Sequence, residues 1–344
     1  MVAAHFLCGV GQELCLFFAP HMNSFGDKWC FTSFGESHSA AIGGVLDGVP
    51  AGLHIDFAMI RDALDRRAGR NHKSQIANHK SCGVSPRALR EPDEIEWLSG
   101  VLDGVTLGTP IAFLIRNRDA RPQDYEALKH SFRQGHADAT YQAKYGIRDW
   151  RGGGRASARE TAARVVAGNI AAQHLAEQGI HIHARLVQVG DETRPELFDE
   201  LINRYRAEGD SIGGIIACEV SGLPAGLGEP IFDKLQAHLA YAMMSINACK
   251  GFDYGSGFAG VGQPGSVANQ HSGGLLGGIT DGTTLTFRCV FKPTPTTPKV
   301  LAQLQNAQMV NAKIVNRSDA CVSVRAVPVV EAMTALVLAN FVTE

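Results

Sequence analysis

A chain of 344 residues with 45% apolar side chains is long enough to bury a large hydrophobic core without disulfide or metal staples. Its formal net charge of −2 supplies no overall field that would attract nucleic acid or an anionic membrane surface. The eight cysteines are spaced singly with no C-x-x-C pair, which indicates buried thiols in a reducing compartment rather than a zinc site or a disulfide framework.

Residues 1–21 are mildly apolar but lack the basic region that begins a secretory signal, and His5, Gln12 and Glu13 interrupt the apolar run. We therefore expect an N-terminal extension over 1–21 and a single large working domain over 22–344. No stretch reaches the roughly 20 apolar residues that a membrane-spanning helix needs. The sequence predicts a soluble, cytoplasmic protein.

The first predicted helix covers Asp56–Arg67, where Phe57, Ile60 and Leu64 recur at helical spacing. Residues 68–90 mix basic and small polar types without periodicity, which predicts a long functional loop. The run Arg61–Arg90 holds eight Lys or Arg residues against two acids, a pattern typical of a solvated surface.

A second helix is predicted over Ala158–Gln178, because Ser157 and Glu160 form a capping-box pattern before it and Gly179 follows it. Ile180–Val187 then alternates apolar and polar residues, as a half-buried strand does. The elements predicted after it are a helix near 195–208, a strand near 214–220, a helix near 230–246, a strand near 284–291 and a helix near 329–342. The fold class is therefore mixed α and β.

A second basic run, Arg148–Arg164, holds five arginines against two acids and surrounds three consecutive glycines ahead of the second helix. Free amides at a helix N-terminus and forked guanidinium groups suit a phosphate or carboxylate. A plain glycine turn with solvated arginines explains the run equally well. The run fits neither the dinucleotide-binding nor the P-loop pattern.

Two histidines, His38 and His136, lie in predicted loops, where an imidazole could donate a proton to a leaving group or could serve only as a local hydrogen-bonding residue. His181 and His183 share one face of the predicted strand. No Cys, Asp or Glu accompanies them at ligand spacing, so they are interpreted as structural and no metal site is predicted.

Several segments together resemble the chorismate synthase family. The resemblance runs from about Met22 to the C-terminus, and the segments keep the family's order. They are Phe34-Gly35-Glu36-Ser37-His38, Arg133-Gln134-Gly135-His136-Ala137-Asp138, Arg151-Gly152-Gly153-Gly154-Arg155-Ala156-Ser157-Ala158-Arg159-Glu160-Thr161, Gly209-Asp210-Ser211-Ile212-Gly213, Pro224-Ala225-Gly226-Leu227-Gly228-Glu229-Pro230, Met244-Ser245-Ile246-Asn247-Ala248, Arg317-Ser318-Asp319-Ala320-Cys321 and Arg325-Ala326-Val327-Pro328.

The resemblance implies a β-α-β sandwich, a homotetramer, and a lyase that eliminates phosphate from 5-enolpyruvylshikimate-3-phosphate with the help of reduced FMN. It implies three catalytic residues: His38 at the reduced flavin, His136 beside the departing phosphate, and Asp319 assisting the flavin nitrogen that takes the ring proton. The residues it implies for FMN are Arg155, Ala156, Ser157, Asn247, Ala248, Gly277, Lys292, Pro293, Thr294, Pro295, Thr296 and Arg317. Those it implies for the anionic substrate or for NADPH as reductant are Ser37, Arg66, Arg67 and Arg159.

The chain departs from the family's pattern at a few positions. Ser39 stands where Gly is usual, Ala139 where Tyr is expected, and Ser318 where His is common, while the segment from Arg66 to Glu91 is altered and long. These departures leave open a flavin-binding paralogue that has lost turnover. A nucleic-acid binder, which the arginine runs alone would suggest, is disfavoured by the negative net charge and by the 7% content of aromatic residues.

Overall fold

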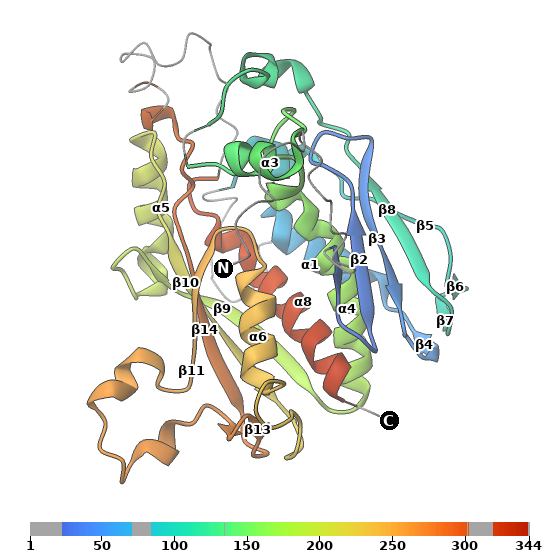
Figure 1. Ribbon diagram of the computed structural model, residues 1–344, viewed down its shortest axis with the longest axis vertical. Coiled ribbons are helices and arrows are strands. Elements are labelled where there is room, and N and C mark those ends of the chain that lie inside the picture. The colour runs from blue at the N-terminus through green and yellow to red at the C-terminus, as the bar shows by residue number, and fades with distance from the viewer. Residues whose placement is uncertain (1–22, 71–83, 134, 301, 303–318, 343–344) are drawn as a thin grey trace, which may run out of the picture.

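The computed structural model describes residues 23–70, 84–133, 135–300, 302 and 319–342. Two antiparallel sheets enclose a layer of helices, so that the molecule has three layers in the order sheet, helices, sheet (Figure 1). This arrangement is the β-α-β sandwich that the resemblance implied, and the predicted mixed class is confirmed.

The first sheet comes from the N-terminal part of the chain. Its strands lie in the order β1 (Ser24–Phe25), β2 (Cys30–Phe34), β3 (Ala41–Asp47), β8 (Ile111–Arg116) and β5 (Ile95–Trp97), and every neighbouring pair is antiparallel. Alternate residues of β8 point into the core, where Ile111, Phe113 and Ile115 are fully buried. A small sheet of β4 (Ala51–His54), β7 (Val105–Leu107) and β6 (Val101–Leu102) extends from it.

The second sheet is formed by the later part of the chain. Its order is β11 (Cys249–Tyr254), β14 (Leu285–Phe291), β10 (Gly214–Ser221) and β9 (His181–Val189), again antiparallel throughout. The two-stranded hairpin of β12 (Leu275–Leu276) and β13 (Ile279–Thr280) lies near it.

The helical layer consists of α1 (Phe57–Ala68), α4 (Thr161–Glu177), α6 (Leu235–Met244) and α8 (Ser323–Phe341) (Figure 1). The remaining helices are α2 (Pro86–Arg90), α3 (Asp138–Tyr145) and α5 (Phe198–Ala207). Short 3-10 turns cover η1 (Pro122–Leu128), η2 (Gly154–Ala156), η3 (Ala158–Glu160), η4 (Pro195–Leu197), η5 (Gly257–Gly262) and η6 (Ala268–His271).

Helices α4 and α8 cross at the centre of the core with their backbones almost in contact. A Cβ atom on Gly168 of α4 would lie 2.3 Å from the carbonyl oxygen of Ala332 in α8, so this crossing requires glycine. Among the described helices, only α8 has the length and apolar composition to cross a membrane, and 67% of its apolar window is buried inside the protein. Its burial is that of a core helix.

The predicted elements are found with shifted ends. Asp56, which the prediction placed inside the first helix, instead caps α1, with Oδ1 accepting from the N–H groups of Ala58 (2.8 Å) and Met59 (3.2 Å). The predicted helix at 158–178 begins as the 3-10 turn η3, where the Ser157 hydroxyl accepts from the Arg159 N–H, and becomes α-helical at Thr161.

Two of the predictions need correction. The loop predicted over 68–90 contains a helix, α2, which Ser85 caps and Pro86 begins, both favourable residues at those positions. Residues 71–83 of that loop, like the predicted extension 1–21, lie outside the described residues. The last helix begins six residues earlier than predicted, at Ser323, and includes Pro328 in its interior.

Candidate active site

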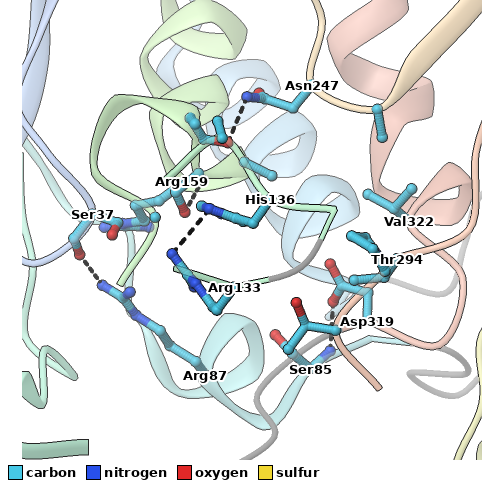
Figure 2. Close-up of a pocket in the computed structure, with 18 of the residues that line it drawn as sticks. Ser37, Ser85, Arg87, Arg133, His136, Arg159, Asn247, Thr294, Asp319 and Val322 are labelled. Carbon is cyan, nitrogen blue, oxygen red and sulfur yellow. Dashed lines mark hydrogen bonds between the residues drawn. The ribbon is translucent and has the colours of Figure 1, made fainter. Parts of the chain in front are cut away.

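A cavity of about 390 Å³ opens where the chain segments that bear the predicted catalytic residues meet. Its walls come from the segment before β3, from α2, from the glycine turn at 152–154, from residues 292–296 and from the start of α8 (Figure 2). The predicted residues that line it are Ser37, His38, His136, Ala156, Ser157, Arg159, Asn247, Ala248, Lys292, Pro293, Thr294, Pro295, Thr296 and Asp319.

His38 lies in the wall of this cavity and is only 4% exposed. Its Nδ1 atom is 3.0 Å from the Ser37 hydroxyl, and Arg87 Nη1 is 3.4 Å from Nδ1 and 3.5 Å from Nε2. The Tyr125 ring packs edge-on against the imidazole. Gly152 fits against the same ring with a φ of +69°, and a Cβ atom there would lie 2.3 Å from Nδ1, so the site requires glycine at this position.

His136 faces the cavity from the short segment that leads into α3. Its Nδ1 atom lies 3.0 Å from Oδ1 of Asp138, and Arg133 Nη2 lies 3.1 Å from the same nitrogen. Arg133 also donates to both oxygens of Asp138, at 2.8 Å each. Histidine, carboxylate and guanidinium thus form one connected group at the edge of the cavity.

Asp319 enters from the opposite wall, just before α8. Its Oδ2 atom accepts a hydrogen bond from Arg325 Nη1 at 2.9 Å, and its Oδ1 atom accepts from the backbone of Ser85 (Figure 2). The carboxylate is 9% exposed. Three residues that the sequence separates by almost 300 positions therefore surround one cavity.

A buried ion network lies directly behind the cavity. Arg159, which lines the cavity, forms an ion pair with Asp93, and Arg67 approaches the same carboxylate to 3.6 Å. Burial opposes ionisation of Asp93, but the two arginines outweigh it and keep the pKa of Asp93 below its usual value. Burial, with the neighbouring charge of Arg325, lowers the pKa of Arg67 to about 9, which still leaves it charged at neutral pH.

The expectation that the run Arg61–Arg90 forms a solvated surface is wrong for two of its members. Arg67 is 1% exposed, and it donates to Thr161 Oγ1 (2.9 Å) and to the carbonyl of Ala158 (2.7 Å). Arg87 pairs with Glu91 and lines the cavity. Arg67 can be buried because Asp93, which lies 26 positions away in the sequence, neutralises its charge, and Glu91 neutralises the partly buried Arg87.

Four of the predicted binding residues do not line the cavity. Arg66 pairs with Glu331 at 2.7 Å, Arg67 lies beneath the cavity floor, and Gly277 lies between β12 and β13. Arg155 points to the other side of the glycine turn, where it lines a second cavity of about 550 Å³ and donates to Ser33 Oγ at 2.7 Å. Arg317 lies outside the described residues.

Several lining residues were not predicted, namely Ser85, Arg87, Glu91, Tyr125, Arg133 and Arg325. Arg133 and Arg325 lie in segments that resemble the family, so these segments were identified, but no role was predicted for either arginine. Arg87 and Glu91 carried no such signal, because only the fold brings α2 to the cavity. The residues that the structure describes contain no group of three or more His, Cys, Asp or Glu that could hold a metal ion.

The comparisons with known proteins agree with this geometry. A family model described as chorismate synthase matches residues 29–343. The chain is 44% identical to the chorismate synthase of Christiangramia forsetii, with 93% of this chain and 97% of that protein covered, and 45% identical to that of Porphyromonas gingivalis, with 93% and 95% covered.

A solved structure is similar as well. The crystal structure of a chorismate synthase superposes with a TM-score of 0.69 at 29% sequence identity, and the alignment covers 92% of each chain. The family model, the relatives and the solved structure all match nearly the whole sequence, and the chain therefore belongs to the chorismate synthase family.

Proposed function

We propose that this chain catalyses the anti-1,4-elimination of phosphate from 5-enolpyruvylshikimate-3-phosphate to give chorismate, and that it requires reduced FMN. Membership of the family makes the chain a lyase. The observation that carries the finer proposal is that His38, His136 and Asp319 line one cavity together with four arginines and Lys292.

The charges around the cavity suit two anionic ligands. Arg87, Arg133, Arg159 and Arg325 each have a carboxylate partner, which fixes the guanidinium groups in place. Lys292 forms no ion pair within the described part of the chain. Cations that are already fixed in place stabilise phosphate more strongly than the same charges in bulk water.

One polar atom supports a flavin at this site. Asn247 donates through Nδ2 to the carbonyl of Ala156 at 3.0 Å, but its Oδ1 atom is buried and has no hydrogen-bond partner among the described residues. A buried acceptor of this kind costs free energy unless a ligand donor meets it. Asn247, Ala248, Ser157 and residues 292–296 would hold the FMN, which supplies electron density to the breaking C–O bond when it is bound.

The chain's own residues then have distinct tasks. His136 delivers a proton to an oxygen of the departing phosphate, and Arg159 holds the anionic groups of the substrate. Asp319, fixed through both oxygens, presents a carboxylate opposite the two histidines. His38 holds the flavin from the wall that bears Ser37 and Arg87.

The decisive experiment is an anaerobic assay of the purified full chain with chemically reduced FMN and the phosphorylated substrate. Chorismate formation that depends on reduced FMN supports the proposal. FMN binding without chorismate would instead favour a paralogue that has lost turnover, the outcome that the altered segment 66–91 leaves open. The same assay with NADPH and oxidised FMN tests whether the chain reduces its own flavin. A homotetramer and a cytoplasmic location stay predictions from the family resemblance.

A further inference from the structure

Asp138 lies behind His136 rather than in the main cavity. It is the first residue of α3 and is 5% exposed, and it lines only the second cavity, on the far side of the glycine turn. Its Oδ1 atom is 3.0 Å from Nδ1 of His136. A carboxylate in this position can act on the reaction only through the cavity-lining side chains that it holds, His136 and Arg133.

The hydrogens of Arg133 decide which atom donates in this contact. Nη2 of Arg133 carries two hydrogens, and it donates to Asp138 Oδ1 at 2.8 Å and to the carbonyl of Gly152 at 2.9 Å. Figure 2 also marks the 3.1 Å approach of Nη2 to His136 Nδ1. Because both hydrogens already have oxygen acceptors, Nδ1 does not need to accept from Arg133 and is left to donate to Asp138.

Asp138 is a reliable acceptor for that hydrogen. Burial opposes its ionisation, but hydrogen bonds from Arg133 and His136 prevail and hold the pKa of Asp138 far below its usual range. The carboxylate is further fixed by the Arg133 backbone N–H at 3.1 Å and approached by Arg148 at 3.9 Å. It therefore accepts from Nδ1 whether the imidazole is charged or neutral.

The other ring nitrogen of His136, Nε2, is available to a ligand in the cavity. It lies next to Gly153, where a Cβ atom would come within 3.3 Å of it, and Gly153 and His136 both line the cavity. Within the described part of the chain, no protein group forms a hydrogen bond with Nε2. A neutral ring with its hydrogen on Nδ1 presents a lone pair at Nε2, and a charged ring presents an N–H there.

We propose that Asp138 is a positioning residue that keeps a hydrogen on Nδ1 of His136, so that Nε2 is the nitrogen that exchanges a proton with the bound ligand. This inference rests on the proposed function. In the elimination, the Nε2–H bond breaks, the proton passes to an oxygen of the leaving phosphate, and the electron pair stays on Nε2. The Nδ1–H bond and its acceptor are unchanged throughout, so the ring needs no reorientation during turnover.

The first test needs no activity. Nitrogen NMR of the full chain with ¹⁵N-labelled histidine, under alkaline conditions in which histidines are neutral, reports which ring nitrogen carries the hydrogen, and His136→Ala assigns the signal. We expect the Nδ1–H form in the wild type and a substantial Nε2–H population in Asp138→Asn. An Nε2–H ring in the wild type, or an unchanged ring in Asp138→Asn, would overturn the proposal.

The second test separates positioning from a structural role. Asp138→Asn should lower kcat at least about tenfold and change KM by less than about threefold, yet cause no further loss of turnover in the His136→Ala background. A further tenfold loss in that background would refute positioning through His136. Asp253→Asn removes a carboxylate on the second sheet whose ion-pair partner among the described residues is Arg288, and this matched control should keep full turnover. If the wild type itself makes no chorismate, the proposed function fails while the NMR test still decides the role of Asp138.

Discussion

The backbone N–H of Ser85 donates a 2.7 Å hydrogen bond to Oδ1 of Asp319, a residue 234 positions further along the chain. Ser85 is the N-cap of α2, and Asp319 lies just before α8. Since Arg325 of α8 holds the other carboxylate oxygen, Asp319 is tied to both helices at once. One carboxylate thus fixes the cavity wall where α2 meets α8.

Replacing Asp319 with Asn should lower turnover with reduced FMN at least about tenfold. The amide keeps an acceptor for the Ser85 N–H but turns a donor toward Arg325, so the charge is lost and one contact becomes repulsive. Steady-state assay under anaerobic conditions measures the change. Asp210→Asn removes a partly exposed carboxylate paired with Lys299 and serves as control. Turnover within twofold of wild type in Asp319→Asn would exclude a role for its charge.

His136→Ala should lower turnover at least about tenfold while leaving FMN affinity within about threefold of wild type. The imidazole is proposed to donate a proton to the leaving phosphate. Its removal should therefore slow the elimination without removing a contact to the flavin. Turnover and the dissociation constant for FMN, measured by flavin fluorescence, check the two parts separately. His183→Ala, an exposed histidine on β9 far from any assigned role, is the control. Unchanged turnover would remove the role given to His136.

The sequence predicted the second half of the fold better than the first. A capping-box pattern identified α4 and residue alternation identified β9, and α5, β10 and β14 were among the elements predicted after them, whereas no strand of the first sheet was predicted. Strand β3 shows why: Gly43 and Gly44 interrupt its alternation, and the rings of Phe34 and Phe31 fill the space where their side chains would lie. Both rings come from the neighbouring strand β2, and no local pattern in β3 reveals them.

The site could be predicted only where residues stood in recognisable motifs. His38, His136 and Asp319 were identified in this way, and the fold brings them to one cavity. Arg87 and its partner Glu91 could not be, because α2 is brought to the cavity by contacts with residues distant in sequence, such as the hydrogen bonds from Ser85 to Asp319 and from Arg87 to Ser37. Local sequence does not show that Arg67 is buried either. Its counter-ion, Asp93, lies 26 positions away, and the hydroxyl that accepts its hydrogen bond belongs to Thr161, which is still further along the chain.

Acid should destabilise this protein partly through Asp93. Its pKa is lowered in the folded state, so the stability that it contributes is fully present above its unfolded pKa of about 4 and is lost as the pH falls through the lower, folded pKa. Asp93→Asn should cost about 3–5 kcal/mol at pH 7, because it leaves Arg67 and Arg159 buried without their counter-ion. Asn tolerates the left-handed backbone at this position, where φ is +51°, so the variant tests the charge.

Urea unfolding midpoints of wild type and Asp93→Asn between pH 2.5 and 7 measure this effect. The difference between the two proteins should be largest near neutrality and should shrink below pH 4. Glu96→Gln removes a solvent-accessible carboxylate that pairs with Arg116, and we expect its midpoints to follow those of wild type. A difference that stays constant over the whole pH range would contradict an electrostatic origin.

The crossing of α4 and α8 gives a prediction about packing. Gly168→Ala adds a methyl group 2.3 Å from the Ala332 carbonyl oxygen and 2.4 Å from its Cα atom, so the two helix backbones must move apart. We expect a loss of about 1–3 kcal/mol, even though alanine favours the helix by about 1 kcal/mol. Ala332→Gly in the same chain should not restore stability, because the clash involves backbone atoms. Gly265→Ala, at a position with no atom within 4 Å of the new methyl group, should leave the unfolding midpoint unchanged, and an equally small effect of Gly168→Ala would show that the helices are not in close contact there.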